Sequence, residues 1–391
     1  MRSSLILLLI AFITACGSDP IRVPHKLVDI KPEAKVRLQW VRQHGTGNGV
    51  QYVKLQPAVN GSIIYSVDRQ GLVTAYDKAT GKTVWSKKYP IEASAGPTVD
   101  ADSILIASFN GEVLALNLED GTQKWKVLVS SEILSAPVSA SGKVLVHTND
   151  GKLFAFNNSN GQLQWTYDRT VPVLSLRGTS KPVIIGDIVF DTFSNGKLTI
   201  LRLNDGKVLL EQPQAIPKGR TDLERMVDSD SGPVVDNDIV YSASYQGFVH
   251  ATNLRAGRKL WQREISTFLP MLVQGELLYI VDEFDTVWAI NKRSGVPVWK
   301  QEQLYARALT APTMMGEYLL FGDYAGYVHV LDKNDGHFVT RVLVTSPEED
   351  SHYDLTEEDV AGIQVAPVVN GNTFYVYANS GRIAAYTIQS K

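Results

Sequence analysis

One stretch decides the fold: Gly71-Leu-Val-Thr-Ala75-Tyr-Asp77-Lys-Ala-Thr-Gly81-Lys-Thr-Val-Trp85. The same spacing of Gly, Ala, Asp or Asn, Gly and Trp returns in full from Gly111, Gly151 and Gly247. Copies with changed or missing positions begin at Gly196, Asp285, Gly326 and Gly381. A proline precedes each copy by 14 or 15 residues, at positions Pro57, Pro97, Pro137, Pro182, Pro233, Pro270, Pro312 and Pro367. Eight units with a period of about 40 residues predict a β-propeller.

Each unit contains the chemistry of four short strands. After the proline comes a β-rich run such as Ile63-Ile64-Tyr65, and a turn that ends on the first glycine, where a positive φ costs little. The alanine is small enough for close sheet packing, and Asp77 can hydrogen-bond the following turn. The tryptophan at the end of the unit is expected to fill the widening gap between blades. A helical solenoid of similar period is the alternative, but the turn residues and the β-branched content disfavour it.

The ends of the chain complete each other. The eighth unit runs out at Lys391 before its outer strand, and residues 36–40, Val-Arg-Leu-Gln-Trp40, supply a strand with Trp40 in the place of Trp85. We therefore predict an all-β, eight-bladed propeller over residues 36–391, closed by the N-terminal strand. Closure removes open sheet edges that would otherwise aggregate. The glycine-rich stretch 45–49 after this strand is expected to be a flexible connection.

The N-terminus carries an export signal. Arg2 precedes an apolar run that is too short to span a bilayer, and Ile13-Thr14-Ala15-Cys16 follows. This stretch resembles the bacterial lipobox, which implies cleavage after residue 15 and acylation of Cys16, with an ordinary signal peptide as the alternative. Gly17 resembles the signal for export to the outer membrane of a Gram-negative bacterium. Residues 16–35, which contain three prolines, are expected to form a flexible tether that leaves beside the seam of the ring.

Composition and motifs argue against an enzyme. The net charge of −3 is too small to imply nucleic-acid binding, and a single cysteine excludes a disulfide framework and a cysteine metal site. The seven histidines form no His-x-x-x-His pair, and His250 and His329 share one repeat position, which favours packing between blades. No acidic cluster has calcium-loop spacing. We expect no catalytic residue, no metal and no cofactor.

The repeat itself resembles that of quinoprotein dehydrogenases, which hold pyrroloquinoline quinone above a calcium ion. Those enzymes typically place a vicinal disulfide over the cofactor, and this chain cannot form one. A fold does not carry its function with it. A quinoprotein-like enzyme and a glycan-binding propeller lipoprotein nevertheless stay open as alternatives.

Long connections indicate where a partner would bind. The connections between an outer strand and the next inner strand are longest after blades three, four and seven, and long loops on a rigid scaffold often build binding surfaces. Two of them contain Val173-Leu174-Ser-Leu176-Arg177 and Arg225-Met226-Val-Asp228-Ser-Asp230. An arginine beside desolvated leucines is a plausible interface anchor. The alternative is that the leucines pack an inner strand and the aspartates cap turns.

The lipobox, the repeats, the closing strand and these two loops together resemble the lipoprotein family of the β-barrel assembly machinery (the BAM complex). The resemblance implies that Leu174, Leu176, Arg177, Asp228 and Asp230 contact the POTRA domains of the barrel subunit BamA. It also implies a non-enzymatic scaffold on the periplasmic face of the outer membrane, a monomer by itself, that orients BamA or binds unfolded barrel precursors. The acidic stretch 341–366 receives no role and is expected to be solvated.

Overall fold

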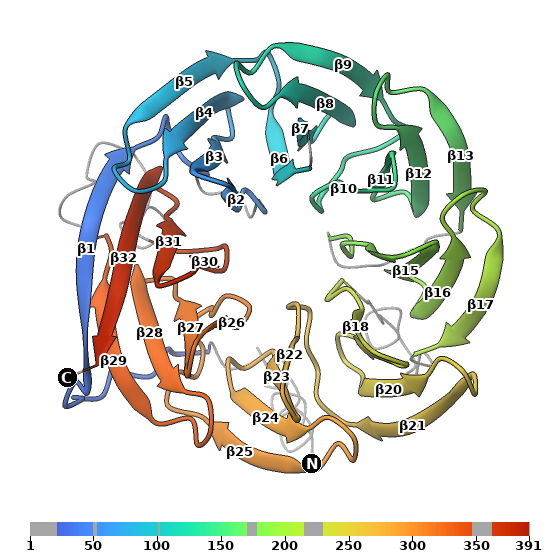
Figure 1. Cartoon of the computed structure of the whole chain (residues 1–391). Helices are drawn as coiled ribbons and strands as arrows, with labels where there is room; N and C mark the ends of the chain where they lie inside the picture. The colour runs from blue at the N-terminus through green and yellow to red at the C-terminus, as the bar shows by residue number, and fades with distance from the viewer. Residues whose placement is uncertain are drawn as a thin grey trace, which may run out of the picture.

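The computed structural model describes residues 22–49, 53–100, 102–169, 178–214, 230–345 and 362–390, and these form a closed ring of eight sheets (Figure 1). Each sheet is a blade of four antiparallel strands that runs from the central channel to the rim. The predicted fold class is confirmed. In these residues no helix is long and apolar enough to cross a membrane.

The strands follow one order in every blade, from the inner strand outwards. The inner strands are β2 (Ala58–Asn60), β6 (Ala93–Val99), β10 (Val138–Ala140), β14 (Val183–Ile185), β18 (Val234–Asp236), β22 (Leu272–Gln274), β26 (Thr313–Met315) and β30 (Val368–Asn370). The second strands are β3 (Ile63–Val67), β7 (Ser103–Ser108), β11 (Lys143–His147), β15 (Ile188–Phe193), β19 (Ile239–Ala243), β23 (Leu277–Val281), β27 (Tyr318–Gly322) and β31 (Thr373–Tyr377). The third strands are β4 (Leu72–Asp77), β8 (Glu112–Asn117), β12 (Lys152–Asn157), β16 (Lys197–Arg202), β20 (Val249–Asn253), β24 (Val287–Asn291), β28 (Tyr327–Asp332) and β32 (Arg382–Ser390). The outer strands are β5 (Thr83–Lys88), β9 (Gln123–Leu128), β13 (Leu163–Asp168), β17 (Val208–Pro213), β21 (Arg258–Arg263), β25 (Pro297–Gln301), β29 (Phe338–Leu343) and β1 (Ala34–Gln43).

The pairing of β1 with β32 closes the ring. In blade one Ala75 is the cross-strand partner of Trp85, and a bulge follows directly. In blade eight Ala385 is the partner of Trp40, so the N-terminal strand reproduces the register of the other outer strands. The predicted role of residues 36–40 is therefore confirmed.

The repeated tryptophan and the repeated glycine meet between blades. The indole of Trp40 lies over Gly81 of the next blade so closely that a Cβ there would stand 2.6 Å from the ring. Trp40 Nε1 also donates to the carbonyl of Lys78 at 2.9 Å. The same glycine–tryptophan contact recurs for Gly121 with Trp85, Gly161 with Trp125, Gly206 with Trp165, Gly295 with Trp261 and Gly336 with Trp299. Where blade four has Leu210 in place of tryptophan, Gly257 of blade five has open space.

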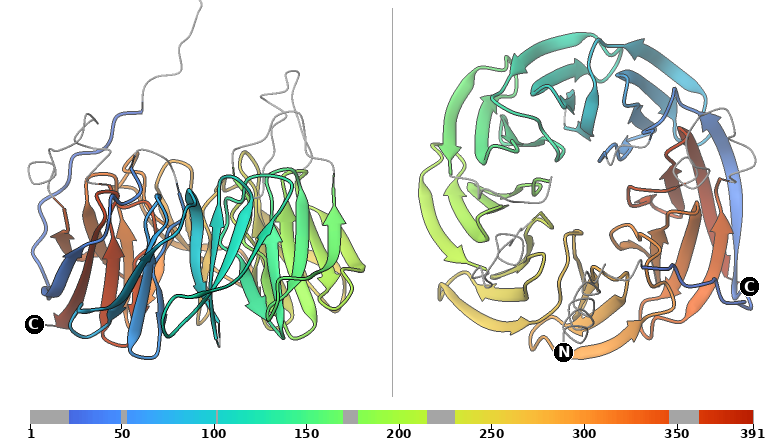
Figure 2. Two further views of the ribbon diagram at one scale, coloured as in Figure 1. Left: turned by 90° about the horizontal axis from the view of Figure 1, so that it is seen from above. Right: turned by 180° about the vertical axis from the view of Figure 1, so that it is seen from behind.

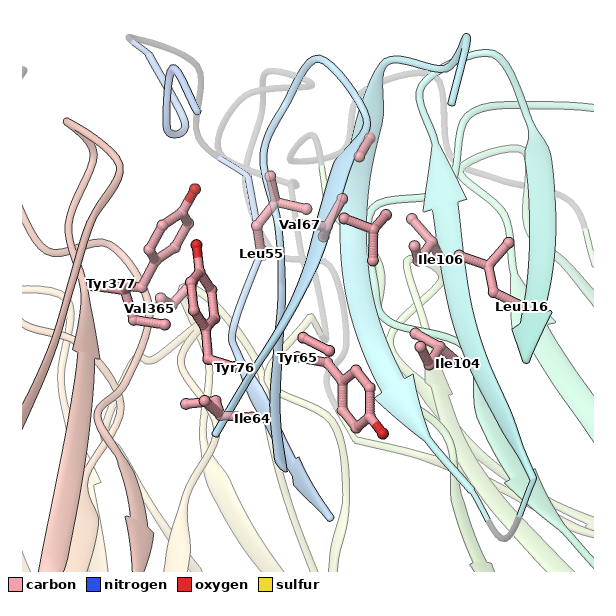
Figure 3. Close-up of a cluster of buried hydrophobic side chains, with 14 of the residues drawn as sticks. Leu55, Ile64, Tyr65, Val67, Tyr76, Ile104, Ile106, Leu116, Val365 and Tyr377 are labelled. Atoms are coloured by element: carbon pink, nitrogen blue, oxygen red, sulfur yellow. The ribbon is translucent and has the colours of Figure 1, made fainter. Parts of the chain in front are cut away.

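The hydrophobic core lies between neighbouring blades, away from the channel. Figure 3 shows the cluster that joins blades eight, one and two, in which side chains such as Tyr377, Ile64, Tyr65 and Ile104 pack against one another. The described residues form seven such clusters. Because each cluster draws on adjacent sheets, the blades stabilise one another around the whole ring.

The glycine-rich connection after β1 differs from the expectation. His44 and Asn48 are buried, and the backbone amide of Asn48 donates to the carbonyl of Asn379 at 3.0 Å. The amide of Thr46 donates to the carboxylate of Asp68 at 3.1 Å. Residues 44–49 therefore form a packed joint between blades eight and one, and the predicted flexible connection is wrong for this segment.

Candidate partner-binding surface

All crossings from an outer strand to the next inner strand emerge on one face of the disc, which we call the crossing face (Figure 2). The turns between second and third strands lie on the same face, because successive strands alternate in direction. The long connections expected after blades three, four and seven run between β13 and β14, β17 and β18, and β29 and β30. Several of the candidate residues lie outside the described residues, namely Cys16, Leu174, Leu176, Arg177 and Asp228, as does the range 346–361 of the acidic stretch.

Asp230 is the candidate contact residue that the structure describes. Only 8% of its surface is exposed, and its carboxylate lies against the backbone of Gly178. A Cβ at Gly178 would stand 2.0 Å from Asp230 Oδ2, so the two residues fit only because one is glycine. Gly178 ends the first candidate loop and Asp230 ends the second. The described ends of the two loops thus lie side by side, as the neighbouring crossings predicted.

A buried polar cluster holds the base of the first loop. The Ser180 hydroxyl donates to the carboxylate of Asp191 and lies 2.6 Å from the carbonyl of Thr192. His147 Nδ1 lies 3.0 Å from Asp191 Oδ2, and none of the three side chains is more than 3% exposed. The cluster fixes the start of blade four against blade three.

These residue types are those of a hydrolase triad, but their geometry differs. In a triad the histidine stands between the serine and the carboxylate, with a different ring nitrogen toward each. Here Ser180 and His147 both contact the carboxylate, and Ser180 Oγ is 3.4 Å from the same Nδ1. Because the cluster is buried, no substrate could reach Ser180. The arrangement is structural.

A cavity of about 430 Å³ lies in the channel, beside the described ends of these loops. It is lined by repeat prolines, by Lys54, Lys181 and Asp230, and by small polar side chains. Lys54 Nζ reaches the carbonyl of Thr179 at 3.4 Å and so links the entry of blade one to that of blade four. The side chain of Lys181 is exposed to this cavity but enclosed by the ring, and the resulting desolvation lowers its pKa.

The lining of this cavity does not fit a quinone cofactor with calcium. Calcium takes six to eight oxygen ligands, with carboxylates prominent among them. Among the described lining residues Asp230 is the single carboxylate, and two lysines stand near it. A cluster of Asp332, Asp335 and His337 has its ligand atoms within 4.8 Å of one another, but it belongs to an outer hairpin turn of blade seven.

Sequence comparison decides the family. The family model described as outer membrane protein assembly factor BamB matches residues 37–126, 69–301 and 285–391. The chain belongs to the BamB family. The BamB of Pseudomonas aeruginosa is 43% identical over 390 residues, covering 99% of both chains, and that of Legionella pneumophila is 41% identical, covering 97% of both. The BamB of Escherichia coli is 34% identical, covering 89% of this chain and 88% of its own.

Solved structures agree on the fold. The crystal structure of BamB from Moraxella catarrhalis matches with a TM-score of 0.80 at 22% identity and covers 90% of this chain and all of that one. A europium-containing methanol dehydrogenase matches with a TM-score of 0.72 at 11% identity, covering 90% of this chain and 93% of that one. At these identities the likeness concerns the propeller alone.

Nothing in the sequence indicated the buried residues, His147 and Asp191, at the base of the first candidate loop. His147 and Asp191 are 44 positions apart on different blades, and no spacing rule connects them. His329, expected to pack between blades, is fully buried and also bonds Asp323. A role for Asp323 could have been inferred from the sequence, because Asp68, Asp282 and Asp323 occupy the same repeat position. Each of these carboxylates accepts a hydrogen bond from the backbone amide four residues further along the chain.

Proposed function

We propose that this BamB-family chain is a non-enzymatic scaffold, anchored by lipid on Cys16 to the periplasmic face of the outer membrane. Its partner is the POTRA region of the barrel subunit BamA, and the contact residues are Leu174, Leu176, Arg177, Asp228 and Asp230. The observation that carries the proposal is the contact of Gly178 with Asp230, which joins the ends of the two loops at one place on the crossing face.

Within this proposal Asp230 acts from the base of the surface. Its carboxylate is largely enclosed, so it offers a partner little area of its own. It holds the two loops in a fixed relation, and the residues further out on each loop supply the contacts, among them an arginine, a residue type that is enriched at interface centres. Preorganisation of this kind lowers the entropy lost on binding.

The rim of the ring supports a second part of the proposal, a contact with unfolded barrel precursors. Outer strands expose apolar side chains to solvent, among them Val84, Leu128, Leu163 and Val298. Their outer edges have no strand neighbour in the described sheets, since each outer strand ends the order of its sheet. An extended peptide can add to such an edge through backbone hydrogen bonds.

Affinity purification of the mature protein from membranes tests the main proposal, and a barrel protein with POTRA domains should co-purify. Arg177→Glu and Asp228→Arg should each abolish this association while thermal unfolding stays nearly unchanged. Because Asp230 is buried, Asp230→Asn is the suitable change there and should weaken the association. Binding that survives all three changes would show that the site lies elsewhere on the ring.

A further inference from the structure

The segment before β1, residues 22–33, lies on the ring and is called the strap here. It has no helix or strand of its own. It runs from the crossing face over blade six, along the outside of blade seven, to the opposite edge of the disc where β1 begins (Figure 2). Its contacts with the ring occur at both ends and in the middle.

The first contact is at Arg22. Its Nη1 donates to the carbonyl of Glu283 at 2.7 Å, and its Nη2 lies 3.5 Å from the Glu283 carboxylate. The guanidinium stands 4.5 Å from the ring centre of Phe284, a cation–π distance. Glu283 and Phe284 form the turn between β23 and β24, so this end of the strap lies on the crossing face of blade six.

The middle of the strap accepts one hydrogen bond from each of two arginines of the ring. Arg307 is 4% exposed, and Asp323 accepts from its Nε at 2.8 Å, while Nη1 donates to the carbonyl of His25 at 3.1 Å. Arg341 Nε donates to His329 Nδ1 at 3.1 Å and its Nη1 to the carbonyl of Val28 at 3.3 Å. A buried guanidinium needs a partner for each donor, and the strap backbone supplies one to each arginine.

Further contacts extend the attachment. The amide of His25 donates to the carbonyl of Tyr305 at 3.0 Å, and Leu27 packs against the core cluster of blades six and seven. At the far end the amide of Glu33 donates to the carbonyl of Val339 at 2.8 Å. Ordering a chain segment costs conformational entropy, so contacts of this density at successive positions indicate a docked segment.

Docking changes the reach of the chain before the ring. Eighteen peptide steps separate Cys16 from Ala34, and an undocked chain of that length could extend about 60 Å. With the strap docked, six steps separate Cys16 from Arg22, which can extend only about 20 Å. The shorter link also starts above blade six on the crossing face. Blades seven and eight separate this point from the seam of blades eight and one, where the predicted tether would start.

We propose that the strap sets the orientation of the ring at the membrane, by holding the crossing face at blade six close to the lipid anchor. The proposal rests on the anchor at Cys16 proposed above. It places the candidate loops beside blade four on the face that carries the anchor point, so a partner domain docked there would lie between the disc and the bilayer or beside the anchor.

The test compares strap variants of the full lipidated protein in vesicles. Arg22→Gln with Leu27→Ser removes two side-chain contacts of the strap, and Lys26→Gln with Lys31→Gln is the matched control, because both lysines are exposed. Hydrogen exchange of the His25 and Glu33 amides reports docking, and it should be faster by about tenfold or more in the first variant but not in the control.

Orientation is read with a fluorophore at one of two opposite positions on the crossing face. Gln303→Cys labels the crossing of blade six, and Asn110→Cys labels the equivalent face of blade two, directly across the ring (Figure 1). A quencher in the lipid headgroups should quench the Gln303 label more than the Asn110 label in the parent protein and in the control. In the strap variant this difference should vanish.

Two results would overturn the proposal: equal quenching of the two labels in the parent protein, or an unequal quenching that persists after amide protection is lost. If both substitutions leave the strap docked, replacing residues 22–28 by glycine and serine removes it, and the same criterion applies. Failure of the anchor is distinguishable, since a chain without lipid on Cys16 would not float with vesicles although its strap amides stayed protected.

Discussion

The indole of Trp40 lies over Gly81, across the seam where the N-terminal strand joins the first blade. Five other pairs of described blades have the same glycine–tryptophan contact. In this pair and the next, the indole nitrogen donates to a carbonyl of the neighbouring hairpin. The second glycine and the tryptophan of the repeat therefore contact each other across the interface between neighbouring blades. Glycine is needed there because a Cβ would meet the ring.

Alanine at Gly81 should destabilise the ring more than alanine at Gly257. Both glycines have a positive φ, 65° and 59°, so both substitutions cost about 1–2 kcal/mol in backbone strain. Only Gly81 has a tryptophan against it, and overpacking there should add about 1–3 kcal/mol. Urea unfolding of the two variants checks the difference, and equal losses would mean that the indole moves aside without cost.

Removal of the buried carboxylate in blade seven should be far more costly than removal of a surface one. Burial alone would raise the pKa of Asp323, but the hydrogen bond from His329 and the charge of Arg307 lower it overall. Asp323→Ala leaves Arg307 buried without its carboxylate, which should cost about 3–5 kcal/mol.

The control for this prediction is Glu276→Ala, which breaks an ion pair with Arg293 whose side chains are 58% and 73% exposed. An exposed pair contributes at most about 1 kcal/mol. The free energy of unfolding by urea measures both variants. Similar losses would show that Asp323 is as easily replaced as a surface residue.

His250 should make the protein less stable in acid. Desolvation first, and then the charge of Lys259, lower its pKa from 6.5 to about 4. Between pH 6.5 and pH 4 the imidazole of His250 is therefore protonated in the unfolded chain but neutral in the folded chain. The stability that the neutral ring contributes is present above pH 6.5 and is lost as the pH falls to 4. The shift corresponds to about 3 kcal/mol.

His250→Gln should make the free energy of unfolding depend less on pH between pH 6.5 and pH 4. The free energy of unfolding, measured at several values between pH 7 and pH 4, should fall less in the variant than in the parent protein. His44, whose pKa desolvation also lowers to about 4, keeps a similar dependence in both proteins. Parallel curves for the two proteins would contradict the assignment to His250.

The sequence predicted the parts of this structure that repeat. Eight copies fixed the number of blades, and the position of Trp40 relative to the missing outer strand predicted closure before any contact was known. The repeat, however, contains only the residues that the blades share, so it cannot predict a contact that does not recur from blade to blade. The cluster of His147, Ser180 and Asp191 and the arginines under the strap join residues that are distant in sequence, and each is found at one place in the described ring.

For the candidate site, the sequence predicted the location but not the burial of its residues. Its place beside blade four followed from loop length, and the structure brings Gly178 and Asp230 together there. That Asp230 is enclosed could not be predicted, because burial depends on the backbone of the neighbouring loop. The prolines and mixed charges of 22–33 resemble those of a linker. Its docking depends on ring residues that are distant in sequence, such as Arg307 and Arg341, and could not be predicted from the segment itself.

Gly178→Ala tests the proposed surface without changing any proposed contact residue. The backbone of Gly178 does not have a positive φ, so alanine adds no strain of that kind, but its Cβ would stand 2.0 Å from Asp230 Oδ2. The carboxylate must move, and the two loop ends must separate. We expect co-purification of the POTRA-domain partner to fall strongly, while the melting temperature drops by only a few degrees, as for a loss of about 1 kcal/mol.

Gly186→Ala is the control for this prediction. Gly186 lies in the turn between β14 and β15 of the same blade, with open space around it, and alanine there introduces backbone strain because φ is 58°. Partner binding that survives Gly178→Ala, at the level of Gly186→Ala, would show that the fixed contact between the loop ends plays no part in recognition.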